Sequence, residues 1–208
     1  MEILIPTRFY GFDSVTYTVA AVIGFLVSYY AFKMYSATSK RTHKYLYLSF
    51  TLLSMGLLVL SVASWYNYFN YEIYHGKYLL DQYVAMDDFA YWIYYLCSIL
   101  GYLLLASMYF PEKGFPLLFL PVWSSGFPYF NVLSLFILSY AIFRSVANFF
   151  SKKNMNSFLV AASFSLIGLY HLLLVFTSFS RFIYVIAHVC LGLGFFSLLV
   201  MLAKVSRK

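Results

Sequence analysis

The sequence predicts an all-α integral membrane protein, a bundle of seven transmembrane helices. Of its 208 residues, 63% are hydrophobic and only 10% are charged, whereas soluble domains carry about 25% charged residues. The apolar residues fall in continuous runs of about 18 to 23 residues, the length a helix needs to cross the hydrocarbon core of a bilayer. Inside lipid the backbone must satisfy its own hydrogen bonds, so we expect each run to be helical. Continuous runs also exclude an outer-membrane β-barrel, whose strands alternate apolar and polar residues.

Six runs are clear spans. The residues before the first run lack the basic region and the small-residue cleavage site of a signal peptide, so we expect this run to be retained as a helix. In chain order the predicted spans are Val15–Phe32, Tyr45–Tyr66, Phe89–Phe110, Phe130–Phe150, Ser157–Phe179 and Phe182–Ala203.

A seventh apolar segment, Gly114–Trp123, is too short to cross as an ideal helix. Proline removes a backbone donor and bends a helix, so this segment is either a short broken span or a re-entrant piece. Four of the five prolines lie in or beside it: Pro111, Pro116, Pro121 and Pro128.

The basic residues favour a full crossing. With seven spans and the N-terminus outside, only Arg8, Lys77 and Arg181 of the 14 Lys and Arg residues lie outside, together with every acid except Glu112. Without the crossing this asymmetry largely vanishes. Basic residues favour the cytoplasmic side of short loops, so we predict a multi-pass protein of the cell membrane with a cytoplasmic C-terminus.

The sequence also contains an internal repeat. FAYWIYYLCSILGYLLLASM (Phe89–Met108) matches FIYVIAHVCLGLGFFSLLVM (Phe182–Met201) at a shift of 93 positions, and both cysteines coincide. FLVSYYAFK (Phe25–Lys33) also matches FILSYAIFR (Phe136–Arg144), at a different shift. Internal repeats indicate a duplicated architecture. We therefore divide the single membrane domain, residues 1–208, into repeat one (15–110), a linker helix (111–129) and repeat two (130–208).

An odd number of spans between the copies gives both the same orientation, related by an axis along the membrane normal. Most residues shared by the two copies fall on one arc of a helical wheel, and we expect this face to pack inside the bundle. Gly101 and Gly194 should then mark close approaches between helices, because small residues let helices approach in lipid.

This three-plus-one-plus-three layout resembles the superfamily that groups SWEET sugar transporters, vitamin transporters and seven-helix opsins. The resemblance covers the whole chain in organisation only, and no family motif matches. SWEET repeats carry hinge prolines in their first two helices, which are missing here. Opsins carry a lysine midway along the last helix, whereas Lys204 lies at the end of the last span, which argues against retinal linkage.

No Asp, Glu, Lys or Arg lies in the middle of a predicted span. Intramembrane charges usually mark ion pathways and proton relays, so their absence argues against an ion-coupled transporter. It also removes the paired acids of hydrolytic enzymes, and we expect a non-enzymatic protein. In a membrane protein the excess of basic residues indicates cytoplasmic loops, not a nucleic-acid partner.

His171 and His188 are the strongest candidates for a specific site. They lie at similar depth on consecutive antiparallel spans, and two facing imidazoles could hold a b-type haem. The alternative is a pair of neutral buried histidines bonded to tyrosine or backbone partners.

Other candidates for ligand contacts are Trp92 and Tyr95, which could line a cavity, and Cys97 and Cys190, which lie at similar depth. Packing is the alternative for all four, since a free buried cysteine behaves as a small apolar residue. No metal-binding or nucleotide-binding motif is present.

The first copy exceeds the second by a tyrosine-rich, acidic outer segment, Tyr66–Asp88. Extra length on one face of a repeat protein often marks its binding face, but this segment could also be an amphipathic helix at the lipid surface. Asp87 and Asp88 either bind a cation or cap the third span.

These patterns leave three hypotheses. The first is a sensor, receptor or membrane-complex subunit that takes a ligand or a partner through Tyr66–Asp88 and signals through a membrane or cytoplasmic protein. The second is an uncoupled facilitator for a small neutral or aromatic solute that passes between the repeats. The third is an electron-transfer subunit with haem b on His171 and His188.

Overall fold

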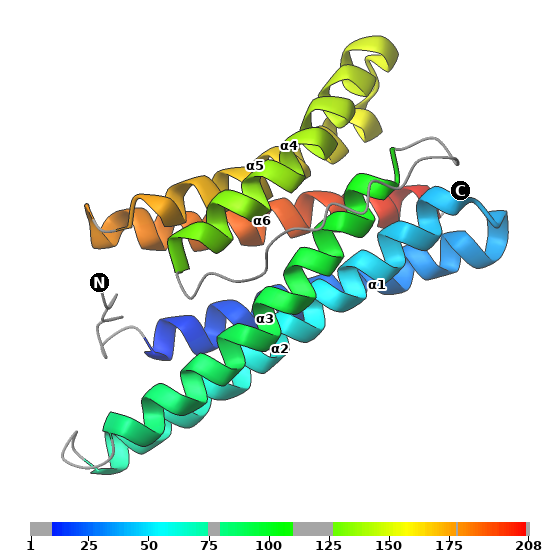
Figure 1. Ribbon diagram of the computed structural model, residues 1–208. Coiled ribbons are helices and arrows are strands. Elements are labelled where there is room, and N and C mark those ends of the chain that lie inside the picture. The colour runs from blue at the N-terminus through cyan, green and yellow to red at the C-terminus, as the bar shows by residue number, and fades with distance from the viewer. Residues whose placement is uncertain (1–9, 75–79, 110–126, 178, 207–208) are drawn as a thin grey trace.

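The chain folds into long α-helices (Figure 1). The computed structural model describes residues 10–74, 80–109, 127–177 and 179–206. Within these ranges it contains no β-strand. Its helices are α1 (Tyr10–Thr38), α2 (Arg41–Tyr74), α3 (Leu80–Ser107), α4 (Phe127–Lys152), α5 (Met155–Val175) and α6 (Arg181–Ser206).

All six of these helices are long and apolar enough to cross a membrane. Side chains on their outer faces are exposed large hydrophobics, such as Val62, Phe136 and Phe182, and in a bilayer these faces contact lipid. The predicted all-helical, multi-pass membrane protein is therefore confirmed. The predicted seventh span, Gly114–Trp123, lies outside the described residues.

The helices form two groups of three, α1–α2–α3 and α4–α5–α6, each with consecutive helices packed side by side. The groups meet at two seams, where α1 packs on α6 and α3 packs on α4. Figure 1 shows that α1 and α4, the first helix of each group, start at the same end of the molecule, and that α6 ends at the opposite end.

Both seams join parallel helices. Along the first seam Tyr184 bonds Asp13 and His188 bonds Tyr17, so contacts advance in the same direction on α6 and α1. Along the second seam Tyr95 stacks on Phe130 with ring centroids 4.1 Å apart, and Tyr140 bonds the carbonyl oxygen of Tyr109. Because α3 and α4 are parallel, the end of α3 and the start of α4 lie at opposite ends of the bundle.

Two glycines occupy equivalent close approaches in the two groups. A Cβ built on Gly101 of α3 would lie 3.0 Å from Leu53 and 3.2 Å from the carbonyl oxygen of Ser49 on α2. A Cβ built on Gly194 of α6 would lie 3.0 Å from Ile167 and 3.1 Å from the carbonyl oxygen of Ser163 on α5. In each case the partners are a serine carbonyl and the apolar residue four positions later. The expected role of these glycines in helix packing is confirmed.

The prediction that the face shared by the repeats packs inside the bundle is wrong for much of its length. Phe89 and Phe182 are 65% and 70% exposed, and Leu100 and Leu193 are 44% and 52% exposed. Interior positions of the shared pattern include the two glycines, Cys190, and Leu105 and Leu198, both leucines being 0% exposed. Lipid and protein interior accept the same apolar residues, so a shared Phe or Leu does not distinguish them.

The outer segment Tyr66–Asp88 belongs mainly to two helices. α2 continues to Tyr74 and α3 already begins at Leu80, so this end of the molecule carries a helical hairpin that reaches beyond the start of α1 (Figure 1). With 34 residues, α2 is about 51 Å long at 1.5 Å per residue, well above the ~30 Å hydrocarbon core. Trp65 stacks on Phe69 at 5.4 Å near the base of this hairpin, as aromatic residues do at membrane interfaces.

Candidate functional site

Polar side chains join α1 to α6 near the N-terminal end of the bundle. Asp13, in the first turn of α1, is 2% exposed and accepts a hydrogen bond of 2.7 Å from the Tyr184 hydroxyl. One turn further along, the Tyr17 hydroxyl lies 3.3 Å from Nε2 of His188. The two polar pairs therefore form successive rungs between parallel helices.

A second polar group joins α3, α4 and α5. His171 is completely buried, with its Nε2 2.7 Å from the Tyr102 hydroxyl and its Nδ1 2.8 Å from the amide oxygen of Asn131. This histidine thus links three helices, one of which belongs to the other half of the molecule.

Tyr170 lies between the two groups. Its hydroxyl is 3.4 Å from that of Tyr94, and its ring centroid lies 4.8 Å from His171 and 5.6 Å from His188. The result is one buried assembly, the histidine network, that crosses both seams: Asp13, Tyr17, Tyr94, Tyr102, Asn131, Tyr170, His171, Tyr184 and His188.

The hydrogen bonds assign the same tautomer to both histidines. Nδ1 of His188 faces the carbonyl oxygen of Tyr184 at 2.9 Å, and Nδ1 of His171 faces the amide oxygen of Asn131. Both oxygens only accept, so Nδ1 carries the proton in each ring. In a neutral ring Nε2 then accepts from a tyrosine hydroxyl, that of Tyr102 for His171 and that of Tyr17 for His188. This agrees with the alternative that we kept beside haem binding.

These residues do not fit a haem held between the two histidines. Axial ligation needs the Nε2 lone pair, which here accepts from Tyr102 in His171 and from Tyr17 in His188. The ring of Tyr170 contacts both imidazoles and takes the space that a macrocycle would need. Among the described residues there is also no group of three His, Cys, Asp or Glu side chains arranged to hold a metal ion.

The other predicted site residues do not gather at the network's centre. Trp92 is 52% exposed on the outside of the bundle, so it does not line an interior cavity. Tyr95 stacks on Phe130 at the edge of the network. Asp88 is exposed at the start of the third membrane span, and the side chain of Asp87 lies outside the described part.

Cys97 and Cys190 are both free. Cys97 packs on α2: a Cβ built on Gly56 of α2 would lie 3.1 Å from the Cβ of Cys97. Cys190 is 7% exposed, inside the core. Both positions suit the packing role that we considered for them.

Sequence reasoning missed Asp13, Tyr17 and Asn131. Asp13 precedes the first hydrophobic run and was therefore placed outside the membrane. A signal existed, because Asp13 and Tyr17 are four residues apart, as are Tyr184 and His188. This spacing places each pair on one helical face.

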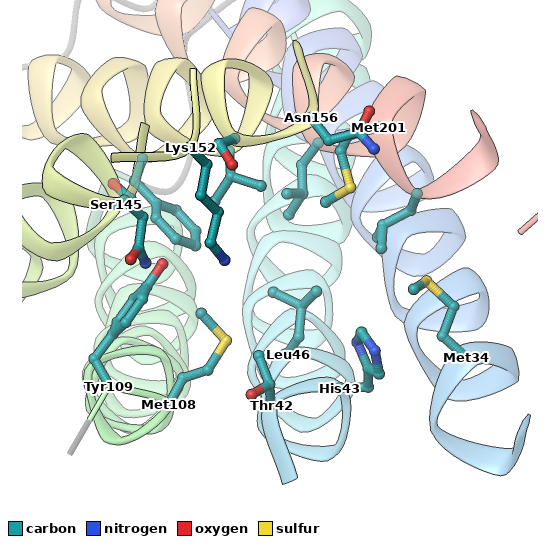
Figure 2. A pocket seen from close by; sticks show the side chains of 16 residues that line it. Met34, Thr42, His43, Leu46, Met108, Tyr109, Ser145, Lys152, Asn156 and Met201 are labelled. Carbon is teal, nitrogen blue, oxygen red and sulfur yellow. The ribbon is translucent and has the colours of Figure 1, made fainter. Parts of the chain in front are cut away.

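The opposite end of the bundle carries a cavity of about 240 Å³ (Figure 2). Its lining comes from α1, α2, α4, α5 and α6 and from Met108 and Tyr109, directly after α3. Tyr109 is one of its lining residues. We call this end, with Lys40, Arg41, Lys44, Lys152, Lys153 and Lys204, the basic end.

Comparison of the chain with protein-family models, curated proteins and solved structures finds no match. Functional conclusions therefore rest on the geometry of the histidine network and of the cavity.

Proposed function

We propose that this protein is a non-enzymatic membrane sensor or receptor, acting alone or as a subunit of a membrane complex. Its two halves would be repeats related by rotation about the membrane normal, with the N-terminus outside and a seventh crossing between them. Three features support this layout. Both seams join parallel helices, the two halves have equivalent glycines, and α3 ends at the opposite end of the bundle from the start of α4.

The observation that carries the proposal is the histidine network. Apolar packing would be enough to hold the halves together, yet both seams carry buried polar side chains. Polar residues in membrane interiors are costly and usually functional. Interhelical hydrogen bonds in membranes contribute about 0.6 kcal/mol each, so the four bonds of the network that join the two halves contribute about 2.4 kcal/mol together.

This free energy is small enough for the protein to switch between two arrangements of its halves. A ligand or partner with an affinity about two orders of magnitude higher for one arrangement supplies about 3 kcal/mol, enough to offset the network. The hairpin formed by the ends of α2 and α3 stands beside the network on the same end of the bundle and is where such a partner would bind. Basic loops at the other end would pass the change to a cytoplasmic protein.

Distance measurements between spin labels test the switch. Labels at Val19 on α1 and Tyr129 on α4, both on the lipid-facing surface, report separation of the halves in protein reconstituted into nanodiscs, after Cys97→Ser and Cys190→Ala. We expect one narrow distance distribution for the parent chain. Tyr102→Phe combined with Tyr184→Phe keeps both rings but removes two hydrogen bonds between the halves, one from α3 to α5 and one from α6 to α1, and should populate a second distance.

Tyr29→Phe is the matched control, because Tyr29 is 60% exposed on α1 and lies outside the network. It should leave the distribution unchanged. An unchanged distribution in the Tyr102→Phe, Tyr184→Phe variant would show that the network is ordinary packing and would refute the proposed switch.

Uncoupled transport of a small neutral solute is the second candidate, and the cavity at the basic end favours it. A facilitator needs a path between its halves, and the cavity opens along that line while the histidine network closes the other end. Liposome swelling with glycerol and urea separates the two candidates. Flux above protein-free liposomes that Val160→Phe abolishes, by filling the cavity, would favour the facilitator; absence of flux in the folded parent chain favours the sensor.

A further inference from the structure

The cavity at the basic end has an apolar floor and a polar rim. Its floor includes Leu46, Phe164, Leu198 and Leu202, all buried. Polar groups of His43, Asn148, Lys152 and Asn156 stand around the opening. A cavity with this division accommodates a molecule that is apolar at one end and polar at the other.

The rim carries positive charge. Among the described residues, none that lines the cavity is Asp or Glu. In Figure 2 the side chain of Lys152 reaches into the opening between Tyr109 and Leu46. Lys40, Arg41 and Lys44 follow along the adjoining end of α2 and its turn, so the potential at the opening favours an anion.

Two further groups point to an anionic ligand. α5 begins at Met155, and Asn156 and Ser157 in its first turn line the cavity, so the positive end of this helix dipole lies at the opening. Nδ1 of His43 is buried without a hydrogen-bond partner, although buried polar atoms are normally bonded. A ligand oxygen at the rim would supply that partner when Nδ1 is protonated.

We propose that this cavity binds a single-chain anionic amphiphile, with its carboxylate at Lys152 and His43 and its chain on the apolar floor. The volume of the cavity limits the length of the ligand's hydrocarbon chain. A volume of about 240 Å³ corresponds to roughly eight groups of the size of a water molecule at ~30 Å³ each, and a methylene group is of similar size. A carboxylate with about eight carbons fits, whereas a two-chain phospholipid does not fit inside. This site is independent of the switch proposed for the histidine network.

Binding of octanoate to the full chain tests the inference. In nanodiscs of neutral phosphatidylcholine, titration followed by ¹⁹F NMR of 8-fluorooctanoate should show saturable binding above that of empty nanodiscs. Octanol, with the same chain and no charge, should compete at least tenfold more weakly than octanoate. Nanodiscs with phosphatidylglycerol show whether a lipid headgroup takes the site instead, because such lipid would then abolish octanoate binding.

Matched variants locate the site. Lys152→Gln should weaken binding about three- to tenfold, as loss of a partly exposed charged hydrogen bond does. Lys153→Gln removes the same charge one residue away, outside the cavity lining, and should leave binding unchanged. Val160→Phe fills the cavity and should remove saturable binding while the protein elutes as before on size exclusion. Equal weakening by both lysine variants, no saturable binding, or displacement by phosphatidylglycerol would each overturn the proposal.

Discussion

Replacing Gly194 by alanine tests how closely α6 approaches α5. The added methyl group would lie 3.0 Å from Ile167 and 3.1 Å from the carbonyl oxygen of Ser163, closer than ordinary packing allows. Overpacking of this kind costs about 1–3 kcal/mol. Alanine also favours the helix by about 1 kcal/mol relative to glycine, so we expect a net loss of about 1 kcal/mol.

Gly192 provides the control on the same helix, because a Cβ built there meets nothing within 4 Å. Gly192→Ala has the same helix preference without the clash. The two variants should therefore differ in free energy of unfolding by about 2 kcal/mol.

For a chain of this length, 1 kcal/mol moves Tm by about 2–4 °C. Thermal unfolding in mild detergent, followed by circular dichroism, should therefore place Gly194→Ala about 4–8 °C below Gly192→Ala. Gly101→Ala should resemble Gly194→Ala, because its surroundings on α2 are equivalent. Equal Tm values for the variants at 192 and 194 would refute the packing argument.

Three more outcomes follow from the site. Tyr184→Phe should destabilise the fold by about 0.6 kcal/mol because Asp13 loses one donor, and Asp13→Asn should cost less in that background than in the parent chain, as a double-mutant cycle measures. Trp92→Ala, on the lipid-facing surface, should change the free energy of unfolding by less than about 0.5 kcal/mol, and a larger loss in the same melt would contradict its placement. The purified protein should show no Soret band, because the Nε2 atoms of His171 and His188 already accept hydrogen bonds; a band lost on His171→Ala would reverse this reading.

Hydropathy was enough to predict the helices because lipid imposes the same demand on every span. Apolar length, closed backbone hydrogen bonds and proline placement are local properties, and they located six helices to within a few residues in most cases. The largest departures are at the ends of α2 and α3, where the helices continue through the tyrosine-rich segment Tyr66–Asp88. Hydropathy does not predict where these helices end, because a helix can continue beyond the membrane with the same backbone hydrogen bonds.

The histidine network could be predicted only in part. Both histidines were identified from their depth, but their partners come from helices far away in the sequence, such as Tyr102 and Asn131 for His171. Asp13 was missed because averaging over a span treats a carboxylate at the helix start as outside. Its burial depends on Tyr184, 171 residues later, which no local pattern contains.

The two rungs between α1 and α6 also restrict how the halves can move. Asp13 and Tyr17 are four residues apart, as are Tyr184 and His188, so the two hydrogen-bonded pairs follow one another at the same spacing on both helices. Sliding one helix by less than a turn would break both rungs at once, and sliding by a whole turn, about 5.4 Å, would preserve at most one pairing level. Opening at this seam is therefore easiest as a tilt that loosens one rung before the other, with the basic end as the pivot.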